Sequence, residues 1–311
     1  MPLFKTSQGR LEPLEQTNFA DERQLHDLIQ RNLAPVFNCR LVASEFTTGA
    51  THGGRIDTLA LSEDSNPVII EYKKVESSEL INQSLFYLAW MDDHRGDFEM
   101  AVQRALGAGV EVDWSEIRVI CIAPDYRKYD LHAVQVMETN IELWRYRYFK
   151  GGLLYLEEVF RKTYAPLGAL SPGGKNPVMV AAGKKAAVSR RTGTHTFEQH
   201  LKGKPQKTQE LARAVQEYVL GLDPAMTETP KKFYVAYKIS QNIVCMELRK
   251  REVVLNLKLD PAQLRPLPPG ARDMTRIGHY GTGNLQVRIR SMEDLEASKG
   301  LIEMAYQKVG G

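Results

Sequence analysis

The pattern of apolar and polar positions predicts a helix followed by a strand hairpin near the start of the chain. Apolar residues recur at helical spacing over residues 21–33, and Asp21 with Gln24 resembles a capping box at its start. Residues 41–48 are typical of a strand. Two further strands, RIDTLAL (55–61) and NPVIIEYKK (66–74), are separated by the turn residues of SEDSNP. We therefore expect these two strands to pair as a hairpin.

The rest of the first half alternates helical and strand patterns. Helices are predicted near residues 79–91, 96–106 and 126–139, and strands at residues 117–124, 141–149 and 153–159. The run IRVICIAP is almost continuously apolar, which is typical of a strand covered on both faces. Helices and strands that alternate in this way predict an α/β domain built around a mixed sheet flanked by helices, over residues 1–160.

The second half predicts a different, smaller domain. Residues 161–195 are rich in Gly, Ala, Pro and basic residues and lack periodicity, which indicates a flexible basic linker. From residue 196 to 311 the patterns predict an amphipathic helix, three strands, a loop rich in Pro and Gly, a fourth strand and a final helix capped by Ser291. The segment GTGN (281–284) is interpreted as a plain glycine turn. This order is typical of an α+β domain.

Composition limits the environment in which the chain works. No apolar run approaches the roughly 20 residues needed to span a bilayer, and the N-terminus lacks the apolar region of a signal peptide. The three cysteines, Cys39, Cys121 and Cys245, are far apart and form no metal-binding pair. We therefore expect a cytoplasmic protein with no membrane partner.

Charge is distributed unevenly along the chain. Residues 1–160 hold 16 Lys and Arg against 25 Asp and Glu, a net charge of −9. The linker holds seven basic residues and no acid, and residues 196–311 hold 18 basic against 13 acidic residues. A basic second half indicates a polyanionic partner, while ordinary solubilising charge is the alternative.

The predicted hairpin carries charged residues where a buried strand should be apolar. Asp57 lies in its first strand, and Glu71 and Lys73 lie in its second, on the same face because strand side chains alternate. Burying an unpaired charge is costly, so this group is either an ion cluster at a sheet edge or a site for chemistry. Two acids and a backbone carbonyl suit a hard cation, and a nearby lysine suits a developing phosphate charge.

Two features of the neighbouring helices favour the chemical interpretation. Gln83 and Tyr87 are four residues apart and therefore share a helix face, where they offer an amide and a hydroxyl. Glu22 lies on the apolar face of the first predicted helix, although the helix dipole alone can account for an acid at that position.

With these parts in order, the chain resembles the PD-(D/E)XK nuclease superfamily over residues 20–160. Within it, the chain is most similar to the branch of the NucS mismatch endonuclease and the RecB-type nucleases. The resemblance implies a restriction-endonuclease-like fold and cleavage of DNA phosphodiesters with Mg²⁺ or Mn²⁺. Asp57, Glu71 and the carbonyl of Tyr72 would be metal ligands, and Lys73 would be the lysine of the motif. Glu22 would be the additional acid, with Glu45 as the competing residue, and Gln83 and Tyr87 would complete the catalytic set.

Several basic residues are further candidates for contact with nucleic acid. They are Arg55, Lys74, Arg145, Arg147, Arg190 and Arg191; for Arg145 and Arg147 an ordinary solvated strand face is the alternative.

Residues 196–311 resemble a C-terminal domain of unassigned function attached to nuclease-like proteins, whose partner or effector is unknown. We expect a metal-dependent DNA endonuclease, for which a homodimer would make cleavage of both strands easiest. The alternative is a catalytically retired nucleic-acid-binding or assembly protein on the same fold.

Overall fold

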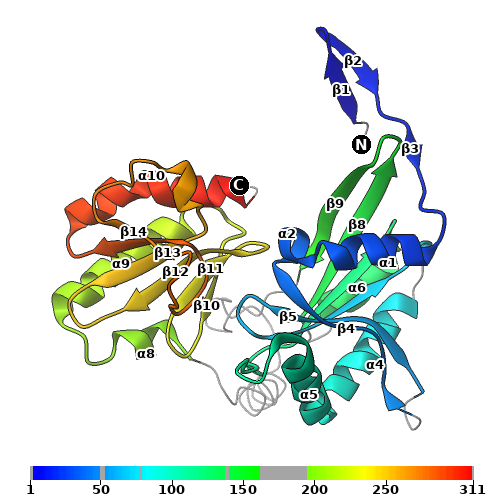
Figure 1. The fold of residues 1–311 in the computed structure, drawn as a ribbon, viewed down its shortest axis with the longest axis horizontal. Helices are drawn as coiled ribbons and strands as arrows, with labels where there is room; N and C mark the ends of the chain where they lie inside the picture. The colour runs from blue at the N-terminus through cyan, green and yellow to red at the C-terminus, as the bar shows by residue number, and fades with distance from the viewer. Residues whose placement is uncertain (1–2, 50–52, 77–78, 137–139, 162–194, 310–311) are drawn as a thin grey trace, which may run out of the picture. The chain divides into compact units, whose positions relative to one another are not determined.

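The computed structural model describes residues 3–49, 53–76, 79–136, 140–161 and 195–309 (Figure 1). The chain divides into two compact units, with the division between residues 171 and 172. Almost all of the predicted basic linker, including Arg190 and Arg191, lies outside the described residues.

The first unit is built on a mixed sheet of seven strands among the described residues, in the order β3-β8-β7-β6-β5-β4 with β9 paired to β8. β5 is antiparallel to its neighbours β4 and β6, whereas β6, β7 and β8 are parallel to one another. The strands are β3 (Gln16–Thr17), β4 (Cys39–Thr47), β5 (Arg55–Ser62), β6 (Pro67–Tyr72), β7 (Arg118–Ala123), β8 (Ile141–Phe149) and β9 (Leu153–Arg161). The predicted hairpin is therefore confirmed as β5 and β6.

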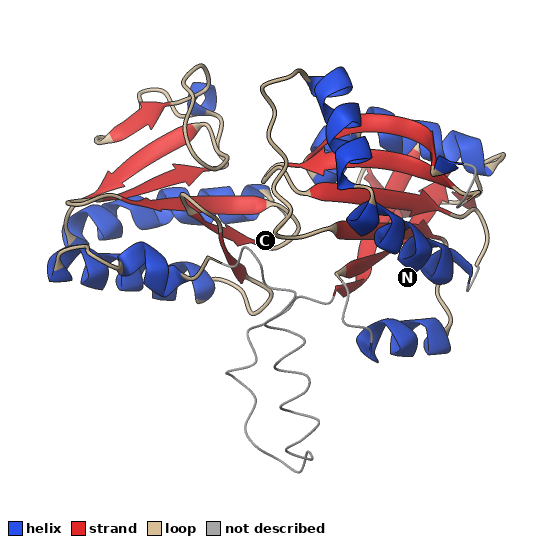
Figure 2. Ribbon diagram, turned by 90° about the horizontal axis from the view of Figure 1, so that it is seen from below, coloured by secondary structure: helices blue, strands red, loops and turns tan. Residues whose placement is uncertain are grey.

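Helices cover both faces of this sheet (Figures 1 and 2). On one face α1 (Glu22–Arg31) and α2 (Leu33–Phe37) pack against the alternate side chains Val68, Ile70 and Tyr72 of β6. On the other face α4 (Glu79–Asp93), α5 (Arg95–Leu106) and α6 (Lys128–Val136) complete a second apolar cluster that includes Ile69. Apart from Glu71 and Arg118, the strands β6 and β7 are apolar on both faces because both faces are covered. This arrangement confirms the predicted α/β fold with a mixed sheet flanked by helices.

Local chemistry sets where the first helix begins and ends. The Asp21 carboxylate accepts a hydrogen bond from the Gln24 N–H at 2.8 Å, which caps the helix as predicted. The helix ends at Arg31 rather than at residue 33, because the chain turns at Asn32 before the short helix α2. Two short strands before it, β1 (Phe4–Ser7) and β2 (Arg10–Pro13), were not predicted because they are too short and polar to show periodicity.

The second unit has a sheet of six strands among the described residues, in the order β10-β11-β12-β13-β15-β14, with its neighbouring strands antiparallel. Helices α9 (Gln206–Leu220) and α10 (Met292–Lys308) pack on one face and enclose the apolar core. The remaining elements are α8 (Phe197–Leu201), β10 (Thr227–Pro230), β11 (Val235–Lys238), β12 (Asn242–Leu248), β13 (Val253–Leu257), η1 (Pro261–Gln263), β14 (Ala271–Asp273) and β15 (Leu285–Ile289). The predicted α+β architecture is confirmed, and Ser291 caps α10 as expected.

A buried ion pair links β7 to β8 in the first unit. The Arg118 guanidinium donates to both carboxylate oxygens of Glu142, at 2.5 and 2.9 Å, and the Trp144 indole N–H donates to the same carboxylate. Glu142 is 3% exposed, so its negative charge depends on this arginine.

Replacing Arg118 by Met should therefore lower the free energy of unfolding of the first unit by about 3 kcal/mol, because it leaves a buried carboxylate without its cation. All three tryptophans (Trp90, Trp114 and Trp144) lie in this unit, so urea unfolding followed by tryptophan fluorescence measures it selectively. The double variant Arg118→Met/Glu142→Leu should recover most of the loss. A single variant as stable as the wild type would contradict this assignment.

Candidate active site

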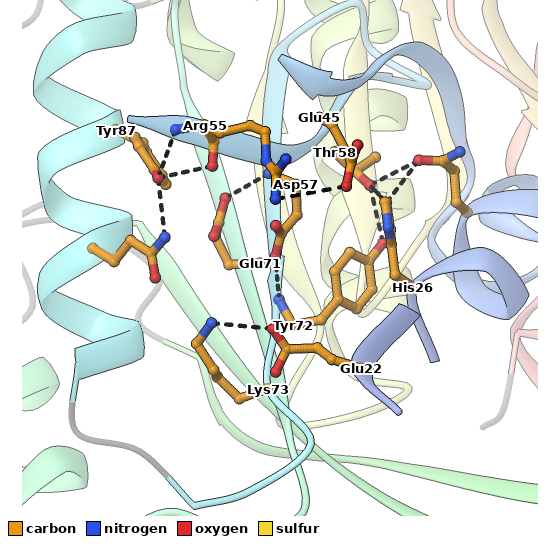
Figure 3. Close-up of polar contacts among 12 residues, drawn as sticks. Glu22, His26, Glu45, Arg55, Asp57, Thr58, Glu71, Tyr72, Lys73 and Tyr87 are labelled. Carbon is orange, nitrogen blue, oxygen red and sulfur yellow. Dashed lines mark hydrogen bonds and ion pairs between the residues drawn. The ribbon is translucent and has the colours of Figure 1, made fainter. Parts of the chain in front are cut away.

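The site begins where the ladder of hydrogen bonds between β5 and β6 ends. The ladder pairs Thr58 with Ile70 as its last residues. One residue further, side chains replace the backbone partners: the Asp57 N–H donates to Glu71 Oε1 at 3.0 Å, and the Tyr72 N–H donates to Asp57 Oδ2 at 3.1 Å. Each acid therefore binds the backbone of the strand opposite, and this exchange fixes the two carboxylates beside each other (Figure 3).

Glu71 is fully buried although it is an acid. It has no exposed surface, and its Oε2 has no hydrogen-bond partner within the described residues. Burial, and then the neighbouring charge of Asp57, raise the pKa of Glu71 to about 9. β6 lies between β5 and β7 in the sheet, so this buried acid does not belong to an edge strand.

Asp57 is half-buried and shares this environment. Burial raises the pKa of its carboxyl group, while the Tyr72 N–H and Lys73 favour the charged form. In a strand the N–H and C=O of one residue point toward the same neighbouring strand. Because the Tyr72 N–H points at Asp57, its carbonyl is also directed toward β5, the side on which it was predicted to act as a ligand.

Lys73 and Glu22 lie together next to the two acids (Figure 3). The Lys73 ammonium lies 3.2 Å from Glu22 Oε1, and the Lys74 N–H donates to Glu22 Oε2 at 3.1 Å. Glu22 also contributes to the electrostatic field at Asp57. Glu45 instead pairs with Arg55 at 3.7 Å, with both side chains more than half exposed. The structure therefore brings Glu22, rather than Glu45, into contact with Lys73.

Gln83 and Tyr87 connect helix α4 to the start of β5. The Tyr87 hydroxyl donates to the Arg55 carbonyl at 2.8 Å and accepts from the Arg55 N–H at 3.1 Å and from Gln83 Nε2 at 3.0 Å. A Cβ added at Gly54 would lie 2.7 Å from the Tyr87 ring, so only glycine permits this approach. The pair holds the backbone two residues before Asp57, and its described hydrogen bonds are not to the acids themselves.

Sequence reasoning missed a polar group on the opposite face of the hairpin. His26 Nε2 lies 3.0 Å from Thr58 Oγ1 and 2.8 Å from Gln30 Oε1, and the Tyr72 hydroxyl lies 3.3 Å from Thr58 Oγ1. The one available signal was that His26 follows Glu22 by four residues, on the same helix face. This group joins α1 to the strands that carry both acids.

Most of the described residues that were predicted to contact nucleic acid already have partners within the first unit. Arg145 pairs with Asp125 at 2.8 Å and with Glu157 at 3.4 Å. The Lys74 ammonium donates to the Ala20 carbonyl at 2.6 Å. Arg147 is partly buried beside Leu3, Tyr155 and Glu157. The contact of these residues, and of Arg55, with nucleic acid stays a prediction.

The donor set suits a hard divalent cation. Among the described residues no group of three or more His, Cys, Asp or Glu side chains is placed to hold a metal. Asp57 and Glu71 nevertheless offer two carboxyl groups, and Glu71 Oε2, which is buried with no hydrogen-bond partner among the described residues, is an atom that a cation would satisfy. Mg²⁺ is commonly held by one or two carboxylates, with water and substrate phosphate completing its shell. The residues present therefore fit Mg²⁺ or Mn²⁺.

The second unit matches a known family of domains. Residues 197–309 match the family described as Domain of unknown function (DUF5655). The expected resemblance of this part of the chain to a domain of unassigned function is thereby confirmed. None of the described helices combines the length and the apolar character that a membrane span requires.

Similar proteins cover either the whole chain or part of it. An uncharacterized protein of Haemophilus influenzae is 27% identical over 312 residues, which covers 99% of this chain and 100% of that protein. The structure of an EndoMS–dsDNA complex is 16% identical with a TM-score of 0.31, covering 42% of this chain and 47% of that one. A repair endonuclease from Pyrococcus abyssi is 14% identical with a TM-score of 0.23, covering 40% and 47%. The chain thus spans about half the length of each solved structure that it matches.

Removing the Tyr87 hydroxyl should destabilise the start of β5. We expect Tyr87→Phe to lower the free energy of unfolding by about 1–3 kcal/mol, because the Arg55 N–H and carbonyl lose a buried partner. The measurement is urea unfolding followed by tryptophan fluorescence. The matched control is Tyr129→Phe, whose ring is 83% exposed and which should leave stability unchanged. Equal stability of the two variants would contradict the tethering role.

Proposed function

We propose that this chain is a divalent-metal-dependent DNA endonuclease of the PD-(D/E)XK superfamily, on a restriction-endonuclease-like fold in the NucS/RecB-like branch. The observation that supports it most is Glu71: a fully buried acid in a central strand, beside a second acid, with one oxygen that has no hydrogen-bond partner among the described residues. One bond to the Asp57 N–H does not offset the burial of a whole carboxyl group, so the fold alone does not account for an acid at position 71. Holding a divalent cation would give the pair a use.

Each residue of the site has a distinct task in this proposal. Asp57 and Glu71, with the Tyr72 carbonyl, would hold Mg²⁺ or Mn²⁺, which lowers the pKa of a water molecule and polarises the phosphate. Lys73 places its ammonium beside the reacting phosphate, where negative charge develops. Glu22 holds Lys73 in position and can release it to substrate, because their pair at 3.2 Å is partly exposed to solvent. Tyr87 and Gln83 fix the strand that carries Asp57.

Two features of the whole chain complete the proposal. Cleavage of both DNA strands would be easiest for a homodimer, which would supply two such sites. The three cysteines are buried and form no disulfide with one another, as suits a reducing cytoplasm.

The decisive experiment is cleavage of plasmid and labelled oligonucleotides by the full-length chain with Mg²⁺, with Mn²⁺ and with EDTA. We expect metal-dependent cleavage, and a fall of about 100-fold or more in rate for Asp57→Asn and for Lys73→Ala, because each removes charge from the reacting centre. Activity unaffected by both substitutions would refute the site assignment. No cleavage of any DNA by the wild type, with DNA binding intact, would favour the retired nucleic-acid-binding protein.

The two candidate acids provide a matched comparison in the same assay. Glu22→Gln should slow cleavage because it frees Lys73 from its only described carboxylate partner, whereas Glu45→Gln should leave the rate unchanged. The reverse order would assign the additional acid to Glu45.

A further inference from the structure

Two aromatic side chains of the second unit stack on each other while half exposed to solvent. The ring centroids of Phe233 and Tyr280 lie 4.5 Å apart with an angle of 25° between the rings, and the two residues are 46% and 50% exposed. The Lys232 ammonium lies over the Phe233 ring, 5.0 Å from its centroid. Large apolar groups grouped at a surface in this way are typical of binding sites.

The loop that carries Tyr280 is held rigidly on the sheet. The Asn256 side-chain amide donates to the Tyr280 carbonyl at 3.0 Å, and the Thr282 N–H donates to Cys245 Sγ at 3.3 Å. The intervening glycines allow this close packing: a Cβ at Gly281 would lie 2.5 Å from Cys245 Cβ, and one at Gly283 would lie 2.6 Å from the Leu257 carbonyl oxygen. The GTGN segment, interpreted from the sequence as a plain glycine loop, thus packs closely on the sheet.

Buried polar groups support this loop at some cost to the core. Asn256 is fully buried, and Gln286, at 2% exposure, donates to Asn256 Oδ1 at 3.1 Å. On the same loop His279 Nδ1 donates to the Ile277 carbonyl at 2.9 Å, which fixes the turn before Tyr280. Polar groups in a sheet interior are unfavourable unless they are hydrogen-bonded. Here their bonds hold an aromatic ring in water in a fixed orientation, which lowers the entropic cost of binding a partner.

The chemistry around the rings favours single-stranded nucleic acid as the partner. Flat aromatic faces beside cations are the features that bind unpaired bases and their phosphates without sequence preference. Along the chain, the segment that leads to Tyr280, residues 264–280, holds three arginines, Arg265, Arg272 and Arg276, and a single acid, Asp273. An acidic peptide would use the cations but would not need two stacked rings, and duplex DNA keeps its base faces covered.

We propose that Phe233 and Tyr280 form a base-stacking site for single-stranded DNA, with Lys232 binding an adjacent phosphate. The inference rests on the proposed function in one respect, that DNA is the substrate. It assigns to the second unit the task of holding an unpaired strand, such as one exposed near the cleavage position. This task also suits its charge, because residues 196–311 are net basic whereas the unit with the acids is net acidic.

The test is fluorescence anisotropy of a labelled oligothymidylate, and of a duplex with mixed sequence, titrated with the full-length chain in EDTA so that no cleavage occurs. Phe233→Leu and Tyr280→Leu should each weaken binding of the single strand about tenfold, because a stacking face is lost while apolar bulk is kept. Tyr280→Phe, which keeps the ring, and Tyr129→Leu, which removes an exposed ring from the first unit, should bind as the wild type does. Binding of duplex should be unaffected by all four.

Photo-crosslinking of a bromodeoxyuridine oligonucleotide to the wild type makes the test independent of how well the variants fold. The crosslink should map to Phe233 or Tyr280. Unchanged single-strand affinity in both leucine variants, a crosslink confined to other residues, or binding of an acidic peptide at these rings in place of DNA would overturn the proposal. If the wild type binds single strands through these rings but cleaves no DNA, only the proposed nuclease function is refuted. If it cleaves DNA but the leucine variants bind single strands as the wild type does, only this base-stacking site is refuted.

Discussion

The first unit depends on a single exchange of hydrogen bonds between two neighbouring strands. Where the β5–β6 ladder stops, the Glu71 carboxylate accepts from the Asp57 N–H and the Asp57 carboxylate accepts from the Tyr72 N–H. The two carboxyl groups replace backbone carbonyls as acceptors. The backbone pairing of β5 with β6 can therefore end here without leaving the Asp57 and Tyr72 N–H groups unsatisfied. The same bonds occupy one oxygen of Glu71, whereas the other is buried and has no hydrogen-bond partner in the part of the chain that the structure describes.

The helices on the two faces of the sheet hold this opening in place from opposite sides. Helix α4 contributes the Tyr87 hydroxyl, which binds both backbone groups of Arg55 just ahead of Asp57. Helix α1 contributes His26, bonded to Thr58, and Glu22, bonded to Lys73. Each anchor lies within two residues of an acid along the strand, so small shifts of either helix would move the carboxylates. Such preorganisation is what a charge-stabilising site requires.

The chain also separates two demands that conflict electrostatically. A cation site needs carboxylates, and these add to a first domain whose net charge is −9, which repels DNA. The second unit is net basic and displays the Phe233–Tyr280 pair, whose attraction to bases does not depend on charge. Binding and chemistry can therefore be supplied by different parts of one chain.

Much of this organisation follows from the sequence, because it depends on local patterns. Alternation in VIIEYKK places Glu71 and Lys73 on one face, and the four-residue spacing of Gln83 and Tyr87 places them on one helix face. The sequence could not show that Tyr87 binds the backbone of Arg55 rather than an acid, nor that Glu45 turns to Arg55, since both depend on the approach of distant segments. His26 was missed for the same reason: its partner Thr58 lies on another element.

The most direct measurement of metal binding at this site is a crystal structure of the full chain soaked in Mn²⁺, with anomalous scattering collected at the manganese edge. The account predicts a peak between Asp57 and Glu71, in contact with Glu71 Oε2 and the Tyr72 carbonyl. A map in which Mn²⁺ binds elsewhere, or in which Glu71 Oε2 stays unliganded in the presence of the ion, would contradict it.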